Sequence, residues 1–211
     1  MAYDAGMPRS RPNLKKGRLE AFSDGVLAIV ITIMVLELKV PHEAEWSALL
    51  PVLPVLLSYV LSFIYVGIHW NNHHHLLAAA HHVGASVMWS NLHLLFWLSL
   101  IPFVTGWMGE NHFAAVPTAA YGVILLMAAI AYVILQQAIL AIEPADSPLR
   151  RELAIDYKGK LSPVLYITAI VVAFFWPWVA CVLYFVVAAM WVVPDRRAER
   201  AIGARPMGDE S

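Results

Sequence analysis

Charged residues are scarce in this sequence of 211 residues, because Asp, Glu, Lys and Arg together make up only 14% of it. Soluble domains average about 25% charged and about 45–50% apolar residues, whereas 60% of this chain is hydrophobic. The composition therefore excludes a soluble globular fold. Apolar runs long enough to cross about 30 Å of hydrocarbon recur along the whole length, which indicates an all-α integral membrane protein.

Cysteine is almost absent, since Cys181 is the single one. This excludes an intramolecular disulfide and any metal cluster built on cysteine. G-x-S-x-G, H-E-x-x-H, Walker and Rossmann patterns are missing as well, so we expect no enzymatic activity and no cofactor. We also expect no cleavable signal peptide, because residues 1–17 are polar and basic and the first apolar run is long enough to remain as a span.

The apolar runs predict six transmembrane helices. Four of them cover about 19–39, 48–72, 84–108 and 114–142. The segment 161–193 is too long for one straight span, and Trp176-Pro177-Trp178 at its middle predicts a turn at the aromatic interfacial belt between two helices. The predicted organisation is a basic N-terminal segment 1–17, one transmembrane domain 18–194 and a charged tail 195–211.

Positive charge is distributed unevenly between the predicted loops. Of the 14 Lys and Arg, only Lys39 lies in a predicted loop on the side of the membrane opposite to the N-terminus. The others precede the first span, lie in the connection 143–160, or follow the last span. Cytoplasmic loops carry the excess of Lys and Arg, so both termini and the 143–160 connection are predicted to be cytoplasmic.

Polar side chains within the first three predicted spans lie at a similar depth. Ser23 and Asp24 lie about one and a half turns into the first span, and Asn91 about two turns into the third, which starts on the same side. Intramembrane polar groups are costly and point to function. A buried network of Asp24 with His73 or His69 and Asn91 is therefore geometrically possible, while the alternative is that Asp24 faces cytoplasmic water.

The stretch HWNNHHHLLAAAHH, residues 69–82, concentrates histidines at the end of the second predicted span. His69 and His73 have the i, i+4 spacing that can present two imidazoles to one metal ion. Glu and Asp are absent from residues 46–109, however, so the ligand count is low. A wetted helix end or a pH-sensitive cytoplasmic loop explains the same residues.

One face of the first predicted span carries small and branched residues at helical spacing. The row consists of Phe22, Gly25/Val26, Ile29, Thr32/Ile33 and Leu36. Small residues and Thr favour close helix contacts in lipid, so the spacing alone is equally consistent with a helix-packing seam.

The pattern R-x-x-x-F-S-D opens this span, with Arg18, Phe22, Ser23 and Asp24 at its fixed positions. It resembles the signature of the prokaryotic TMEM175-type potassium channels. HWNNHH at 69–74 and NLHLLFWLSLIPFVTGWMGE at 91–110 are similar to the end of that family's second span and to its third span. The resemblance implies a homotetramer of six-helix subunits in the bacterial inner membrane, with a central pore lined by the first helix of every subunit.

The resemblance also assigns residues. It implies a constriction of aliphatic side chains in place of a carbonyl filter, with K⁺ as the permeant ion and with Ile29, Thr32, Ile33 and Leu36 facing the pore. It further implies a structural network that holds the first helix, formed by Arg18, Phe22, Ser23, Asp24, Trp70, His73 and Asn91. We therefore expect a passive channel selective for K⁺ over Na⁺. The alternatives are a proton or metal-ion transporter that uses residues 69–82, and a non-conducting scaffold.

Overall fold

The structure is a computed structural model that describes residues 14–80, 82–144, 147, 149–150 and 157–192. All regular elements in these ranges are helices. They are α1 (Leu14–Leu36), the 3₁₀ helix η1 (Trp46–Val52), α2 (Leu53–Ala79), α3 (Ala85–Ser99), α4 (Ile101–Glu110), α5 (Ala115–Leu140), α7 (Tyr157–Ala173) and α8 (Pro177–Val192). Of the predicted terminal segments, residues 1–13 and 195–211 lie outside the described residues, and residues 14–17 belong to α1.

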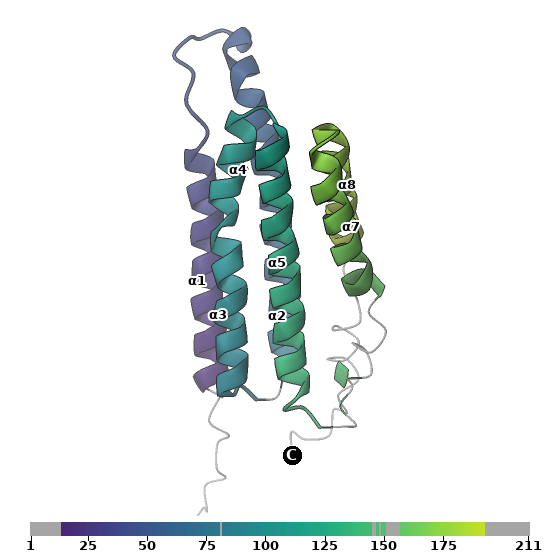
Figure 1. The fold of residues 1–211 in the computed structure, drawn as a ribbon. Coiled ribbons are helices and arrows are strands. Elements are labelled where there is room, and N and C mark those ends of the chain that lie inside the picture. The colour runs from purple at the N-terminus through teal and green to yellow at the C-terminus, as the bar shows by residue number, and fades with distance from the viewer. Residues whose placement is uncertain (1–13, 81, 145–146, 148, 151–156, 193–211) are drawn as a thin grey trace, which may run out of the picture.

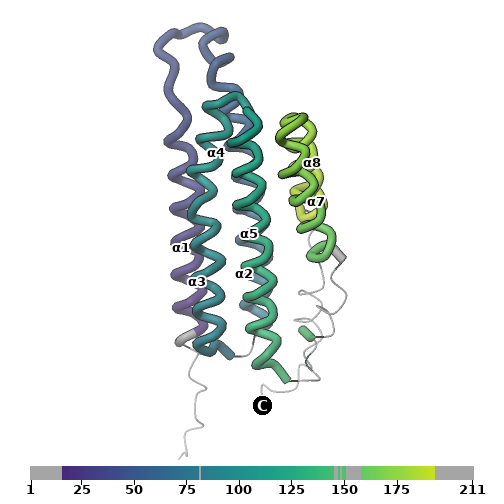
Figure 2. The backbone as a smooth tube through the Cα atoms, viewed as in Figure 1, coloured from purple at the N-terminus to yellow at the C-terminus, as the bar shows by residue number. Residues whose placement is uncertain are grey.

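The long helices stand side by side as an upright bundle, with α1 along one edge (Figure 1). The shorter pair α7 and α8 lies at the opposite side, next to α5, and the chain path in Figure 2 shows the extended connection between α1 and α2 at one end. Four apolar segments are long enough to cross a membrane: Lys16–Leu36, Trp46–Ala79, Ala85–Glu110 and Ala115–Leu140. They confirm the first four predicted spans. With 17 and 16 residues, α7 and α8 are shorter than the about 20 residues of an ordinary span.

The second helix extends further than the sequence predicts. It continues to Ala79, so His73, His74 and His75 lie within a helix. Of the two alternatives for these residues, a helix end agrees with the structure and a loop does not. Leu76 and Leu77 explain the extension, because both side chains are buried in the bundle and their apolar contacts stabilise the last turn.

Prolines account for two other differences from the predicted spans. The third predicted span is interrupted at Leu100, where α3 ends and α4 begins, because Pro102 has no N–H to donate to the preceding turn. The predicted turn at 176–178 lies slightly earlier, at 174–176. Pro177 is the first residue of α8, a position where its missing N–H costs nothing.

The buried residues form two hydrophobic clusters. The first joins α1, α2, α3 and α5 through Leu, Val and Met side chains such as Leu27, Met34 and Leu94. The second joins α2, α4, α5, α7 and α8, and it is rich in Ala and Tyr. Small residues let helix backbones approach closely in lipid, so the second cluster packs α7 and α8 closely against the bundle. The first cluster packs α1 against α2 and α3 on the other side.

Candidate functional site

A chain of hydrogen bonds joins α1, α2 and α3 inside the bundle. Asn91 Nδ2 donates to Ser23 Oγ at 2.9 Å, and His73 Nε2 lies 2.7 Å from Asn91 Oδ1. Ser23 in turn donates to the carbonyl of Leu19 at 2.8 Å. All three polar side chains are buried. Because an amide oxygen can only accept, His73 donates from Nε2, and the chain runs in one direction from His73 to Leu19.

The structure brings together most of the residues predicted for the network, but Ser23 takes the buried position that was predicted for Asp24. Ser23 is fully buried, whereas Asp24 is exposed on the subunit surface. Asp24 accepts a hydrogen bond from Trp70 Nε1 at 3.1 Å. The predicted buried contact of Asp24 with His73 or His69 and Asn91 is therefore wrong. One residue along a helix rotates the side chain by about 100°, and that rotation places Ser23 inside and Asp24 outside.

Arg18 and Phe22 are not part of this network. Both are exposed, and Phe22 has 54% of its surface accessible. Among the described residues, Arg18 makes no hydrogen bond or ion pair. Lys16, which the sequence did not single out, holds α1 instead: its Nζ donates to the carbonyls of Ala78 and Ala80 at 3.0 Å each. The last carbonyls of a helix lack partners within it and attract cations, but nothing local in the sequence places Lys16 beside the end of α2.

The two faces of α1 differ in their surroundings. One face packs into the bundle through Leu19, Leu27, Val30 and Met34, all nearly inaccessible. The opposite face carries the residues predicted to line a pore, and no other helix that the structure describes covers it. Ile29 is 58% exposed, Ile33 44% and Leu36 78%.

Two further features of the open face of α1 are a glycine with open space around it and a threonine hydroxyl. A Cβ built on Gly25 would meet nothing within 4 Å, so no contact inside the subunit requires glycine there, although glycine disfavours a helix by about 1 kcal/mol relative to alanine. Thr32 Oγ1 donates to the carbonyl of Ile29 at 3.0 Å. This bond uses the hydroxyl proton, so the oxygen lone pairs of Thr32 remain free to accept.

His69 and His73, the two candidate metal ligands, have different hydrogen-bond partners. His69 Nδ1 lies 2.9 Å from the carbonyl of Tyr65, while His73 bonds Asn91. In the part of the chain that the structure describes, no group of three or more His, Cys, Asp or Glu could hold a metal ion. The transporter hypothesis stays a prediction, without support from these residues.

An ion pair lies beyond the far end of α1. Lys39 Nζ donates to the Glu110 carboxylate at 2.8 Å, and both side chains are exposed. The hydrogen bond and the negative charge of Glu110 raise the pKa of Lys39 above its ordinary value of 10.5. A group with a raised folded-state pKa contributes stability that is complete below its unfolded pKa. Any contribution of this pair is therefore constant near neutral pH and is lost as the pH rises through the raised pKa.

We predict that Glu110→Gln lowers the pKa of Lys39 and leaves the melting temperature at pH 7 nearly unchanged, because exposed ion pairs contribute little to stability. NMR titration of ¹³C-methylated lysines measures the pKa directly. Glu45→Gln is the matched control, since Glu45 is an exposed carboxylate that accepts a hydrogen bond from Ser47. An unchanged Lys39 titration in Glu110→Gln contradicts the assigned cause.

Helical spans of membrane length, joined by a buried polar network, define an all-helical integral membrane protein. The family model described as endosomal/lysosomal potassium channel TMEM175 matches residues 18–102. A potassium channel of Chryseobacterium sp. (strain P1-3) is 52% identical over 189 residues, which cover 90% of this chain and 98% of that one. A potassium channel of Chamaesiphon minutus is 32% identical over 184 residues, with 82% and 91% covered.

A solved structure agrees with these sequence matches. The crystal structure of a lysosomal potassium-selective channel TMEM175 homolog from Chamaesiphon minutus superposes with a TM-score of 0.75 at 30% identity, covering 86% of this chain and 98% of that one. The chain therefore belongs to the TMEM175 family. The family resemblance inferred from the sequence is confirmed.

Proposed function

We propose that the protein is a passive potassium channel of the cell membrane. The proposal is supported by its membership of the TMEM175 family and by relatives that carry the name potassium channel. The single observation that carries the mechanism is the open apolar face of α1, on a helix that polar bonds fix to α2 and α3. Ion channels catalyse no chemical conversion, so we expect no enzymatic activity and no cofactor, with K⁺ as the permeant ion.

The proposed assembly is a homotetramer of six-helix subunits whose α1 helices surround a central axis. α1 lies at the edge of the bundle (Figure 1), where its open face can meet the α1 helices of other copies. In this arrangement α7 and α8 serve as the fifth and sixth spans, and α8 carries no charged residue among its 16. The asymmetric positive charge supports cytoplasmic termini and a bacterial inner-membrane location.

We propose that a ring of four Ile29 side chains forms the constriction, with rings of Ile33 and Leu36 one and two turns further out. A narrow aliphatic ring gates by dewetting, and an ion that crosses it loses water without gaining replacement oxygens. K⁺ is larger and more weakly hydrated than Na⁺, so partial dehydration costs K⁺ less. Thr32 places a side-chain oxygen 3.0 Å from the carbonyl of Ile29, next to this ring.

A flux measurement tests both the channel and its constriction. We expect purified protein in liposomes to pass K⁺ in preference to Na⁺, and Ile29→Asn to reduce the K⁺/Na⁺ permeability ratio several-fold. The introduced amide would hydrate the ring and lower the dehydration cost for both ions. Val30→Leu is the matched control, because Val30 is buried on the opposite face of α1.

The two parts of the proposal fail separately. Wild-type liposomes that pass no K⁺ would refute the channel. An unchanged permeability ratio in Ile29→Asn, with flux intact, would move the constriction away from Ile29 and leave the channel in place.

A further inference from the structure

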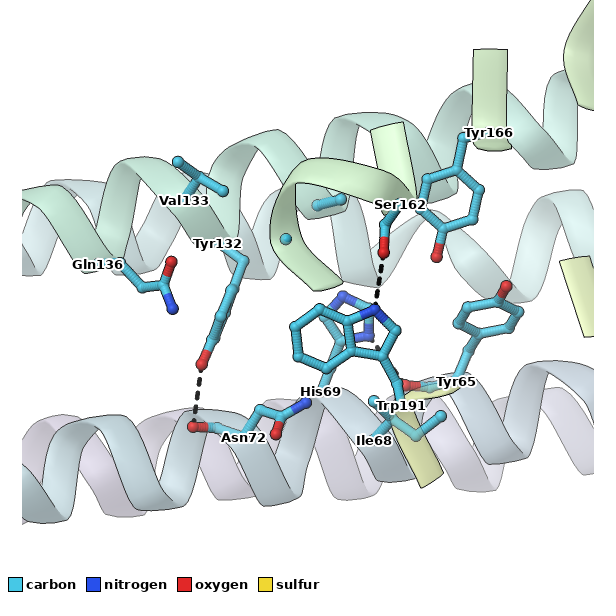
Figure 3. Close-up of a pocket in the computed structure, with 12 residues that line it drawn as sticks. Tyr65, Ile68, His69, Asn72, Tyr132, Val133, Gln136, Ser162, Tyr166 and Trp191 are labelled. Atoms are coloured by element: carbon cyan, nitrogen blue, oxygen red, sulfur yellow. Dashed lines mark hydrogen bonds between the residues drawn. The ribbon is translucent and has the colours of Figure 1, made fainter. Parts of the chain in front are cut away.

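A small cavity lies inside the subunit, away from α1. It has a volume of about 40 Å³ and is lined by residues of α2, α5, α7 and α8 (Figure 3). None of the twelve lining residues belongs to α1. Its polar members include His69 and Asn72 from α2 and Gln136 from α5, and its apolar members include Ile68 and Val133. The cavity is therefore independent of the proposed pore.

His69 offers an unused hydrogen-bond acceptor at this cavity. Its Nδ1 lies 2.9 Å from the carbonyl of Tyr65, and a carbonyl can only accept, so Nδ1 carries the proton. In the neutral imidazole the second nitrogen, Nε2, is then a bare acceptor. Among the described residues no group donates to it.

Gln136 offers a second unsatisfied group. Its side chain is only 8% exposed and lines the same cavity, yet its amide makes no hydrogen bond with any described residue. The amide atoms are not sealed off from the cavity, so they can bond a group that enters it. The neighbouring donors already have hydrogen-bond partners (Figure 3). The Tyr132 hydroxyl donates to the Asn72 carbonyl at 3.2 Å, and Trp191 Nε1 donates to Ser162 Oγ at 2.8 Å.

These two groups together define the chemistry of a ligand. His69 Nε2 needs a donor, and the Gln136 amide can donate to an oxygen. A hydroxyl group supplies both functions from one atom, whereas a carboxylate or a ketone cannot donate to His69. The remaining lining is largely aliphatic and aromatic, which suits a neutral group better than an ion.

The size and position of the cavity indicate where the hydroxyl comes from. About 40 Å³ holds a polar head of two or three heavy atoms, since a water molecule needs roughly 10–15 Å³. The cavity is not fully enclosed, and Val133, which lines it, is also 36% exposed on the surface of the protein. Val133 lies well inside the span Ala115–Leu140, where the surroundings are acyl chains.

We propose that this cavity binds the hydroxyl head of a neutral amphiphile that enters from the bilayer, an aliphatic alcohol or a lipid with a free hydroxyl. The hydroxyl donates to His69 Nε2 and accepts from the Gln136 amide, and its apolar tail passes Val133 along the lipid-facing side of α5. The site goes beyond ion conduction and gives the subunit a lipid-phase ligand held between α2, α5, α7 and α8.

Photolabelling of the full-length protein in liposomes tests the site. The probe is an eight-carbon alcohol that carries a diazirine, and labelled peptides are mapped by mass spectrometry. We expect saturable labelling within residues 65–72, 129–136 and 159–166, with competition by excess octanol and none by octane. Gln136→Leu should reduce it about tenfold, as expected when a hydrogen bond of typical strength is lost.

Gln137→Leu is the matched control, because Gln137 is the next residue on α5 and is exposed. It should label as the wild type does. His69→Phe provides a second variant, and the melting temperature of each variant verifies that it is folded. Equal labelling of wild type and a folded Gln136→Leu protein overturns the proposal, as does equal competition by octane. Labelling that does not saturate also overturns the proposal, because the probe then binds without a specific site and the cavity holds no amphiphile. No readout uses ion flux, so the result is independent of the proposed channel function.

Discussion

Gly109→Ala is expected to lower the melting temperature of the protein by roughly 2–12 °C. A Cβ at Gly109 would lie 2.7 Å from Val55 Cα and 2.5 Å from Ser58 Oγ. The contact with Val55 is a backbone contact, so it cannot be relieved by a rotamer change, and α4 would have to move away from α2. Overpacking of this kind costs about 1–3 kcal/mol, and each kcal/mol corresponds to about 2–4 °C in a chain of this size.

Gly67→Ala is the matched control for this substitution. Gly67 also lies within a membrane-spanning helix, but a Cβ there would meet nothing within 4 Å. Alanine is the better helix former by about 1 kcal/mol, so the melting temperature should stay the same or rise. Thermal unfolding in detergent, followed by circular dichroism or tryptophan fluorescence, measures both variants. If Gly109→Ala unfolds at the wild-type temperature, the close contact of α2 and α4 is refuted.

Asn91→Leu is expected to destabilise the protein by about 1–3 kcal/mol, the cost of leaving a buried polar group unpaired. Leucine is similar in size to asparagine but removes the acceptor for His73 Nε2 and the donor to Ser23 Oγ. Ser23 keeps its bond to the Leu19 carbonyl, so most of the loss falls on His73. The melting temperature should fall by several degrees.

A second substitution distinguishes an unpaired histidine from a simple packing defect. When both partners of a buried hydrogen bond become apolar, much of the cost disappears. We therefore expect Asn91→Leu with His73→Leu to be more stable than Asn91→Leu alone. Asp24→Ala should have a smaller effect than either, since the Asp24–Trp70 bond is exposed in the subunit. A double variant less stable than Asn91→Leu, or an Asp24→Ala variant that is the least stable of all, contradicts the assigned network.

The hydropathy of the sequence predicts the class of protein and the first four spans, because a continuous run of about 20 apolar residues forms a stable helix in lipid without help from its neighbours. The ends of the helices depend on tertiary contacts. α2 reaches Ala79 because Leu76 and Leu77 are buried against other helices, and nothing local in HHHLLAAA indicates those partners. The break at Leu100, by contrast, could be read from Pro102.

The sequence predicts the depth at which the polar residues of the candidate site lie, but not which of their side chains face the interior of the bundle. Ser23, His73 and Asn91 lie at one level because the spans alternate in direction and rise by about 1.5 Å per residue. Which of Ser23 and Asp24 turns inward depends on the rotation of α1 about its axis, which its neighbours set. Gln136 carries no pattern in the sequence, and only the packing of α5 against α2 and α7 places its side chain at the cavity. The pore residues Ile29, Thr32, Ile33 and Leu36 stay predictions.

The hydrogen bonds that tie α1 to other helices have a mechanical consequence. Among the described side chains they involve Lys16, Ser23 and Asp24, all in the first half of α1. Between Gly25 and Leu36 the side chains that face the bundle are apolar, namely Leu27, Val30 and Met34. Apolar contacts are non-directional, whereas hydrogen bonds require a specific geometry. The half of α1 that carries the exposed Ile29, Ile33 and Leu36 is therefore held by less specific contacts than the half that carries Lys16, Ser23 and Asp24.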